Sequence, residues 1–310
     1  MRSEHQPIVG RFAPSPSGRL HLGNLLSSLL AWLDVRSQGG LMLFRLEDLD
    51  PARSFPKFAD QMAEDLLWLG LDWDLGWRSG NTEYAQSHRT EHYAAAMEKL
   101  QAQGLVYDCR CTRAERLAAL APHPDEDRPQ GCRCRTHPKP QTERPAAKKL
   151  FVPDTTIRWT DGHFGQQTDT LRSGEDDFII RRSDGVYAYQ LAVSVDDMEM
   201  CVTRVVRAQD LLSSTALQMT LIRLLGGTPP EYCHCPLLVD ENGRKLSKRA
   251  GDLSMEAFRE RFTPEQLCGT LAKLARLRPT EAPVTPQELA QDFSWDKVPM
   301  EPIRVPNNLI

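Results

Sequence analysis

The stretch APSPSGRLHLGN, residues 13 to 24, decides how the chain begins to fold. It follows an apolar run at 8–13 that is typical of a short buried strand, and it precedes helical apolar spacing from 24 to 37. A second strand pattern, LMLFRLED, follows at 41–48. Strand, helix and strand in this order predict a right-handed βαβ unit in a parallel sheet with helices on its faces.

Within that stretch the residue types suit a ligand site at the start of a helix. Pro14 stiffens the exit from the strand, and Gly18 permits a tight bend. His21, Gly23 and Asn24 come where the helix begins, so its free N–H groups and positive dipole end are available to an anion. Gly23 would let a flat ligand approach the backbone, and His21 could donate to phosphate oxygens. Taken alone, the pattern is more often an ordinary helix entry than a ligand site.

The remaining patterns continue the alternation of helices and strands. Ligands of such α/β sheets bind beyond the carboxyl ends of the strands. The expected elements are helices near 57–69, 86–103 and 209–225, strands at 156–161, 177–182, 186–195 and 235–240, and helical segments at 255–262, 263–277 and 285–293.

Composition shifts divide the chain into four parts. A proline-rich, polar stretch carrying paired cysteines interrupts the α/β pattern, as expected of an insertion with long loops. The predicted parts are the first half of an α/β domain at 1–105, a cysteine-rich insertion at 106–150, the second half of the α/β domain at 151–228, and a basic loop with a helical C-terminal region at 229–310.

Four of the eight cysteines form two CxC pairs, Cys109 with Cys111 and Cys132 with Cys134. In a long chain without an export signal, this pairing favours a metal site over disulfides. His137 is a reserve ligand, and free thiols on a loop are the alternative. The sequence CHC at 233–235 lies in an apolar run, so it is expected to be strand core.

A second motif, RKLSKR at 244–249, follows an Asn-Gly turn. It places Lys245 and Lys248 on a short loop, where ammonium groups could approach a departing pyrophosphate. A solvated basic surface loop is the alternative.

Bulk composition limits the class of protein. The 310 residues are 40% hydrophobic and 26% charged, enough for a sizeable core. A net charge of −4 excludes a broadly basic nucleic-acid coat but leaves room for local basic patches. No apolar run reaches the roughly 20 residues of a membrane span, and the N-terminus has no apolar signal region, so a cytoplasmic location without membrane contact is expected.

The two motifs together resemble a known family. The run RFAPSPSGRLHLGN resembles the first signature of class I aminoacyl-tRNA synthetases, with HLGN in place of HIGH, and KLSKR resembles their second signature, KMSKS. FRLEDLDPAR at 44–53 and VVRAQDLL at 205–212 are similar to segments of glutamyl-tRNA synthetases, so the resemblance spans about 8–250. It implies a Rossmann-like α/β catalytic domain that binds ATP and L-glutamate.

The resemblance also implies roles for individual residues. The glutamate pocket would comprise Arg11, Ala13, Ser15, Glu47, Tyr189 and Arg207. Glutamate carries two carboxylates and one ammonium, which two arginines and one carboxylate complement; structural ion pairs at strand ends are the alternative. The ATP site would comprise His21, Gly23, Asn24, Lys245 and Lys248, with Mg²⁺ on the phosphates and with His21 and Lys248 as the catalytic residues.

The length of the chain indicates the RNA partner. Only 61 residues follow Arg249, fewer than the region with which glutamyl-tRNA synthetases read an anticodon. This layout resembles a paralogous group, the glutamyl-queuosine tRNA(Asp) synthetases, which attach glutamate to queuosine in the anticodon loop of tRNA(Asp). A truncated ligase that charges the 3′ end of a tRNA, and a binding protein without activity, are the alternatives. The resemblance also favours structural Zn²⁺ on the four cysteines and a monomer.

Overall fold

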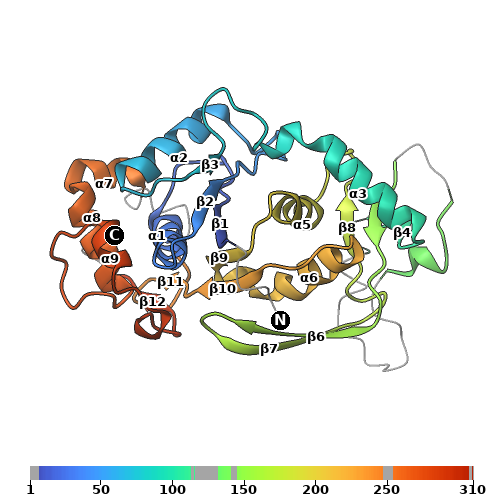
Figure 1. Cartoon of the computed structure of the whole chain (residues 1–310). Coiled ribbons are helices and arrows are strands. Elements are labelled where there is room, and N and C mark those ends of the chain that lie inside the picture. Colours follow the sequence, from blue (N-terminus) through green and yellow to red (C-terminus); the bar gives the residue numbers. More distant parts are fainter. Residues whose placement is uncertain are drawn as a thin grey trace.

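The computed structural model describes residues 7–112, 115, 132–140, 145–246, 254–306 and 309. Its centre is a parallel sheet made of two hydrogen-bonded groups of strands (Figure 1). One group contains β1 (Val9–Phe12), β2 (Leu41–Phe44) and β3 (Leu75–Gly76), and the other pairs β9 (Arg204–Ala208) with β10 (Glu231–Cys235). The groups meet where the backbone N–H of Thr203 donates to the Val9 carbonyl at 2.9 Å, so β9 lies beside β1.

Helices cover both faces of this sheet. On one side lies α1 (Leu22–Arg36), whose leucines are buried against the strands, and on the other lie α5 (Tyr189–Glu199) and α6 (Thr215–Leu224) (Figure 1). The buried apolar residues form two clusters, one on each side. This arrangement confirms the predicted Rossmann-like α/β fold with a parallel sheet.

A smaller antiparallel sheet continues from α3 (Thr90–Ala102). It consists of β4 (Val106–Cys109), β5 (Ala147–Leu150) and β8 (Phe178–Arg181). Between β5 and β8 the chain makes a hairpin of β6 (Thr155–Asp161) and β7 (Gly165–Leu171), whose turn lies next to the main sheet. This hairpin carries Asp161 to the strand β10.

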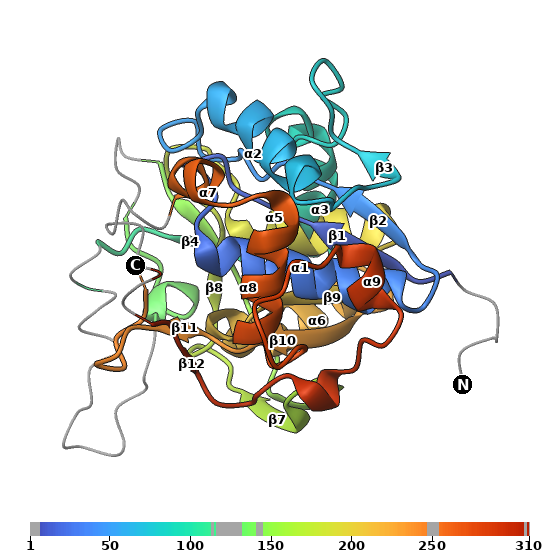
Figure 2. The same ribbon diagram turned by 90° about the vertical axis from the view of Figure 1, so that its left-hand side faces the viewer.

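The C-terminal region packs beside α1 and α2 (Pro56–Trp68) (Figure 2). It comprises the predicted helices α7 (Met255–Arg261), α8 (Pro264–Leu274) and α9 (Pro286–Ala290). Its last strand, β12 (Ile303–Arg304), pairs with β11 (Leu238–Val239), which Pro236 separates from β10. Among the described residues, no helix is long and apolar enough to cross a membrane.

One predicted strand is wrong. Residues 186–195 read as a strand because β-branched and aromatic residues alternate along VYAYQLAVSV, yet the segment from Tyr189 onward is the helix α5. Seven consecutive residues of this helix, 191–197, are buried. A helix buried on all sides has no solvent-facing stripe of polar residues, so no 3.6-residue period is visible in its sequence. The predicted strand at 41–48 is also shorter and ends at Phe44.

Candidate active site

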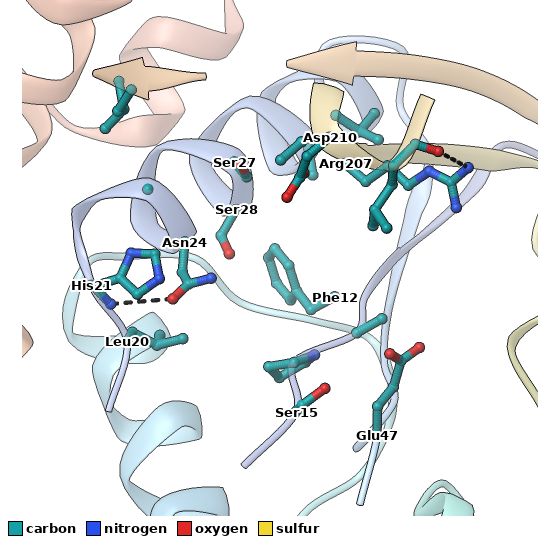
Figure 3. A pocket seen from close by; sticks show the side chains of 18 of the residues that line it. Phe12, Ser15, Leu20, His21, Asn24, Ser27, Ser28, Glu47, Arg207 and Asp210 are labelled. Atoms are coloured by element: carbon teal, nitrogen blue, oxygen red, sulfur yellow. Dashed lines mark hydrogen bonds between the residues drawn. The ribbon is translucent and has the colours of Figure 1, made fainter. Parts of the chain in front are cut away.

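A cavity of about 880 Å³ opens at the carboxyl ends of β1 and β9, beside the start of α1 (Figure 3). Ten of the eleven residues predicted for the two substrates line it, and the eleventh, Lys248, lies outside the described residues. The ten are Arg11, Ala13, Ser15, His21, Gly23, Asn24, Glu47, Tyr189, Arg207 and Lys245.

The start of α1 forms one wall of this cavity. His21 has extended backbone angles and precedes the helix, and its N–H donates to Asn24 Oδ1 at 3.3 Å (Figure 3). A Cβ on Gly23 would lie 3.2 Å from the imidazole carbon Cε1 of His21. Glycine at this position therefore makes room for the histidine ring.

Two buried arginines reach the floor of the cavity from neighbouring strands. Arg11 is 6% exposed and donates from Nη1 to the Val206 carbonyl at 3.0 Å. Arg207 is 5% exposed, and its Nη2 donates to Thr215 Oγ1 at 2.9 Å and to the Leu211 carbonyl at 3.1 Å. These contacts fix both guanidinium groups before any ligand arrives.

Glu47 belongs to a buried network of charges whose other members the sequence did not reveal. Arg45, fully buried, donates to Glu47 Oε1 at 3.0 Å and to Asp197 Oδ1 at 2.7 Å. Asp197 also lies 3.7 Å from Nε of Arg11, so the network joins the two pocket residues. Burial raises the pKa of Glu47 above its ordinary value, and Arg45 and Arg11 lower it in part. Glu47 is thus a carboxylate with little solvent around it.

Tyr189 begins α5 and faces the same charges. Burial raises the pKa of its hydroxyl, and the nearby carboxylate of Glu47 raises it further. The hydroxyl is therefore a neutral hydrogen-bonding group at physiological pH. Position 189 was predicted on a strand, and its place at a helix start brings the ring over the cavity instead.

The mouth of the cavity is more exposed than the floor. Lys245 Nζ lies 2.5 Å from Asp210 Oδ2, and the two side chains are 56% and 42% exposed. Asp210 lines the cavity, as do Ser27 and Ser28 of α1 (Figure 3). None of these three was predicted, although Asp210 lies within the quoted run VVRAQDLL.

The four paired cysteines form a second candidate site, in the insertion. Their sulfurs lie within 4.8 Å of one another, with Sγ to Sγ distances of 3.5 Å (Cys109–Cys132), 3.7 Å (Cys111–Cys132) and 3.3 Å (Cys111–Cys134). Tetrahedral zinc with bonds of about 2.3 Å to thiolates needs sulfurs about 3.8 Å apart. The cluster therefore suits a closed zinc site, while the exposed reserve ligand His137 is not part of the cluster.

Comparisons with known proteins agree on one family. The family described as tRNA synthetases class I (E and Q), catalytic domain, matches residues 7–299. A protein of Nitratidesulfovibrio vulgaris named Glutamyl-Q tRNA(Asp) synthetase is 44% identical over 98% of this chain and 97% of its own length. The protein of the same name from Symbiobacterium thermophilum is also 44% identical, over 98% and 97%.

A solved structure is similar along the whole chain. The crystal structure of a glutamate tRNA ligase from Elizabethkingia meningosepticum, in complex with its amino acid, has a TM-score of 0.81 and 26% sequence identity. The similarity covers 98% of this chain and 68% of that ligase.

Proposed function

The chain belongs to the family of class I tRNA synthetases (E and Q), and from that premise we propose that it activates glutamate with ATP and transfers it to queuosine in the anticodon loop of tRNA(Asp). The observation that carries the proposal is one cavity lined by two fixed guanidinium groups, one buried carboxylate and the start of a helix. The two relatives named Glutamyl-Q tRNA(Asp) synthetase, which are 44% identical over 98% of this chain, support the transfer step.

The floor of the cavity would bind the amino acid. Arg11 and Arg207 offer positive charge to the two carboxylates of glutamate, and Glu47 offers negative charge to its ammonium. Ala13 and Ser15 would approach the ligand along the loop after β1, and Tyr189 would donate its hydroxyl. Because Arg11, Arg207 and Glu47 are held by protein contacts, their charged groups need little reorganisation when glutamate binds.

The start of α1 and the basic loop would bind ATP. His21, Gly23 and Asn24 lie at the helix start, where the backbone N–H groups and the positive end of the helix dipole suit a phosphate. Lys245 and Lys248 would contact the phosphates from the opposite side, and Mg²⁺ would offset the negative charge of the phosphates. The α-carboxylate oxygen of glutamate attacks the α-phosphorus of ATP, the bond to the bridging oxygen breaks, and pyrophosphate leaves with glutamyl-adenylate remaining.

The second half-reaction needs an RNA hydroxyl. A hydroxyl of the cyclopentenediol ring of queuosine would attack the activated carbonyl, lose its proton and release AMP. An anticodon loop suits this chemistry, because loop bases can be splayed out of the stack and reached individually.

Zinc on the four cysteines would have a structural role. Four thiolates complete a tetrahedral shell and leave no open position for a substrate. Burial raises the pKa of Cys109 to about 11, so a bound cation would be needed to hold its thiolate at neutral pH. The cysteines hold the end of β4 to the segment at 132–134 and so brace the insertion.

A labelling experiment tests the proposal. The protein is incubated with ATP, labelled glutamate and tRNA(Asp) from cells with or without queuosine, and in parallel with tRNA(Glu). The proposal requires label only on queuosine-bearing tRNA(Asp). Label on tRNA(Glu) would favour a ligase that charges the 3′ end, and absence of ATP-dependent labelling of every tRNA would favour a binding protein.

A further inference from the structure

Behind the cavity, a chain of three buried side chains runs from the β6–β7 hairpin to Arg207. Asp161 Oδ2 lies 2.5 Å from Nδ1 of His234, and Nε2 of His234 lies 3.0 Å from Nε of Arg207. His234 lies on β10, opposite Arg207 on β9 in the strand register. Asp161 and His234 are 2% and 0% exposed, so neither can touch a ligand in the cavity.

The donors and acceptors in this chain permit only one arrangement of protons. Arg207 is always a donor, so Nε2 of His234 must carry a lone pair rather than a proton. Nδ1 must then carry the proton and donate it to Asp161. Burial lowers the pKa of His234, and the positive charge of Arg207 lowers it further, which keeps the imidazole neutral despite Asp161.

Asp161 is itself held firmly by its own turn and by β10. Its Oδ1 accepts from the backbone N–H groups of His163 at 3.0 Å, Phe164 at 2.9 Å and His234 at 3.2 Å. Gly162 donates to the Tyr232 carbonyl at 2.8 Å, and a Cβ there would lie 2.8 Å from Nη2 of Arg204. The hairpin turn therefore packs closely against β10, and glycine at 162 avoids a clash with Arg204 and Cys233.

The other contacts of Arg207 account for most of its remaining N–H groups. Nη1 donates to Gln218 Oε1 at 2.6 Å, and Nη2 donates to Thr215 and to the Leu211 carbonyl. With the bond from Nε to His234, four of the five N–H groups have partners among the described residues. The plane of the guanidinium is thus set from behind, with one N–H on Nη1 left over.

We propose that Asp161 and His234 are positioning residues for glutamate, which orient the Arg207 guanidinium by presenting it with a neutral imidazole acceptor. The inference rests on the proposed function, because it assigns Arg207 to the amino-acid end of the cavity. It predicts that substitution of Asp161 or His234 weakens the binding of glutamate and leaves the binding of ATP, which we assign to the start of α1 and the basic loop, unchanged.

Asp161→Asn tests the proton arrangement with little change of shape. The asparagine keeps an oxygen for the backbone N–H groups, but its NH₂ group then faces Nδ1 of His234. The imidazole must move its proton to Nε2, which places two donors, Nε2–H and Arg207 Nε–H, against each other. We expect the KM for glutamate in ATP–pyrophosphate exchange to rise at least about tenfold, the scale of one lost hydrogen bond to a charged group, with the KM for ATP within about twofold of wild type.

Substitutions of His234 separate positioning from packing. His234→Leu fills the space without an acceptor and should raise the KM for glutamate at least as much as Asp161→Asn does. His234→Gln presents an amide oxygen to Arg207 and should restore most of the affinity. If leucine and glutamine behave alike in folded protein, the positioning role is wrong.

A matched control is Asp177→Asn. Asp177 is another buried carboxylate that accepts from a backbone N–H, that of Val152 at 2.9 Å, and from a side chain, the Tyr107 hydroxyl at 2.8 Å. It lies beside the antiparallel sheet, so its loss should leave both KM values unchanged. A wild-type protein that shows no glutamate-dependent ATP–pyrophosphate exchange would overturn the proposed function and this inference together. Active wild type with an unchanged Asp161→Asn variant would overturn the inference alone.

Discussion

The two ends of the cavity are built differently. At the floor, Arg11 and Arg207 are nearly inaccessible to solvent, as is Arg45, which contacts the floor residue Glu47. Their guanidinium groups are held by carboxylates, carbonyls and a histidine. At the mouth, Lys245 and Asp210 are about half exposed and hold each other by one ion pair. Removing one partner of a buried ion pair lowers the free energy of unfolding by about 3–5 kcal/mol, whereas an exposed pair contributes about 0–1 kcal/mol to it.

This contrast suits the two tasks that we assign to the ends. A pocket that recognises a small dicarboxylate benefits from donors fixed in advance, because specificity then comes at little cost in reorganisation. A phosphate site that must release pyrophosphate benefits from ammonium groups on a surface loop, which can follow the departing charge. Substitutions at the two ends should therefore differ in size and in kind.

The largest effect is expected from removing a fixed charge at the floor. Arg207→Leu should lower kcat/KM for glutamate in ATP–pyrophosphate exchange by about a thousandfold or more, because it removes a ligand charge and leaves His234 and Gln218 without their donor. Arg158→Leu, on the exposed side of β6, is the matched control and should retain activity. Comparable losses in both variants would mean that the floor has no special role.

The second effect concerns the basic loop. Lys248, which lies outside the described residues, is proposed to contact the phosphates. Lys248→Ala should leave glutamate binding nearly intact, measured by calorimetry, and slow adenylate formation about a hundredfold, measured in single turnovers. Equal losses in glutamate binding and in rate would contradict the separation of the two ends.

A third prediction uses the raised pKa of Glu47. The ammonium of glutamate needs the ionised carboxylate, and the pKa of Glu47 is raised by burial, so kcat/KM for glutamate should fall as the pH falls through that raised pKa. Glu47→Gln should lower kcat/KM about tenfold at neutral pH and abolish the fall of kcat/KM at acidic pH. If kcat/KM of the glutamine variant falls with pH as it does in wild type, Glu47 is not the cause of that fall.

The smallest effect is expected at the exposed pair. Asp210→Asn should change the free energy of unfolding by less than about 1 kcal/mol, because the pair with Lys245 is open to solvent. Chemical denaturation measures this directly. Asp197→Asn, which breaks the buried pair with Arg45, is the comparison and should cost about 3 kcal/mol or more. Similar costs at the two positions would remove the distinction between floor and mouth.

Much of the fold and the cavity could be predicted from sequence, because the signals are local. The strand before residue 13, the helix after His21 and the Asn-Gly turn before Lys245 follow from residue types and spacing. The ten predicted cavity residues meet because parallel strands bring their carboxyl ends to one edge. The paired cysteines likewise form the predicted cluster.

What could not be predicted depends on contacts between distant segments. Asp196 and Asp197 lie on a helix without a visible period, and they bind arginines that precede them by more than 100 residues. His234 was correctly assigned to a buried strand, but its partner Asp161 lies 73 residues earlier on a hairpin. Nothing in either local sequence indicates that the two meet behind Arg207.

A crystal structure with glutamate and a non-hydrolysable ATP analogue bound would test the central claim most directly. We expect both glutamate carboxylates beside Arg11 and Arg207, the ammonium beside Glu47, and the phosphates at the start of α1 facing the basic loop. Glutamate bound elsewhere, or Arg11 and Arg207 turned away from it, would contradict the account.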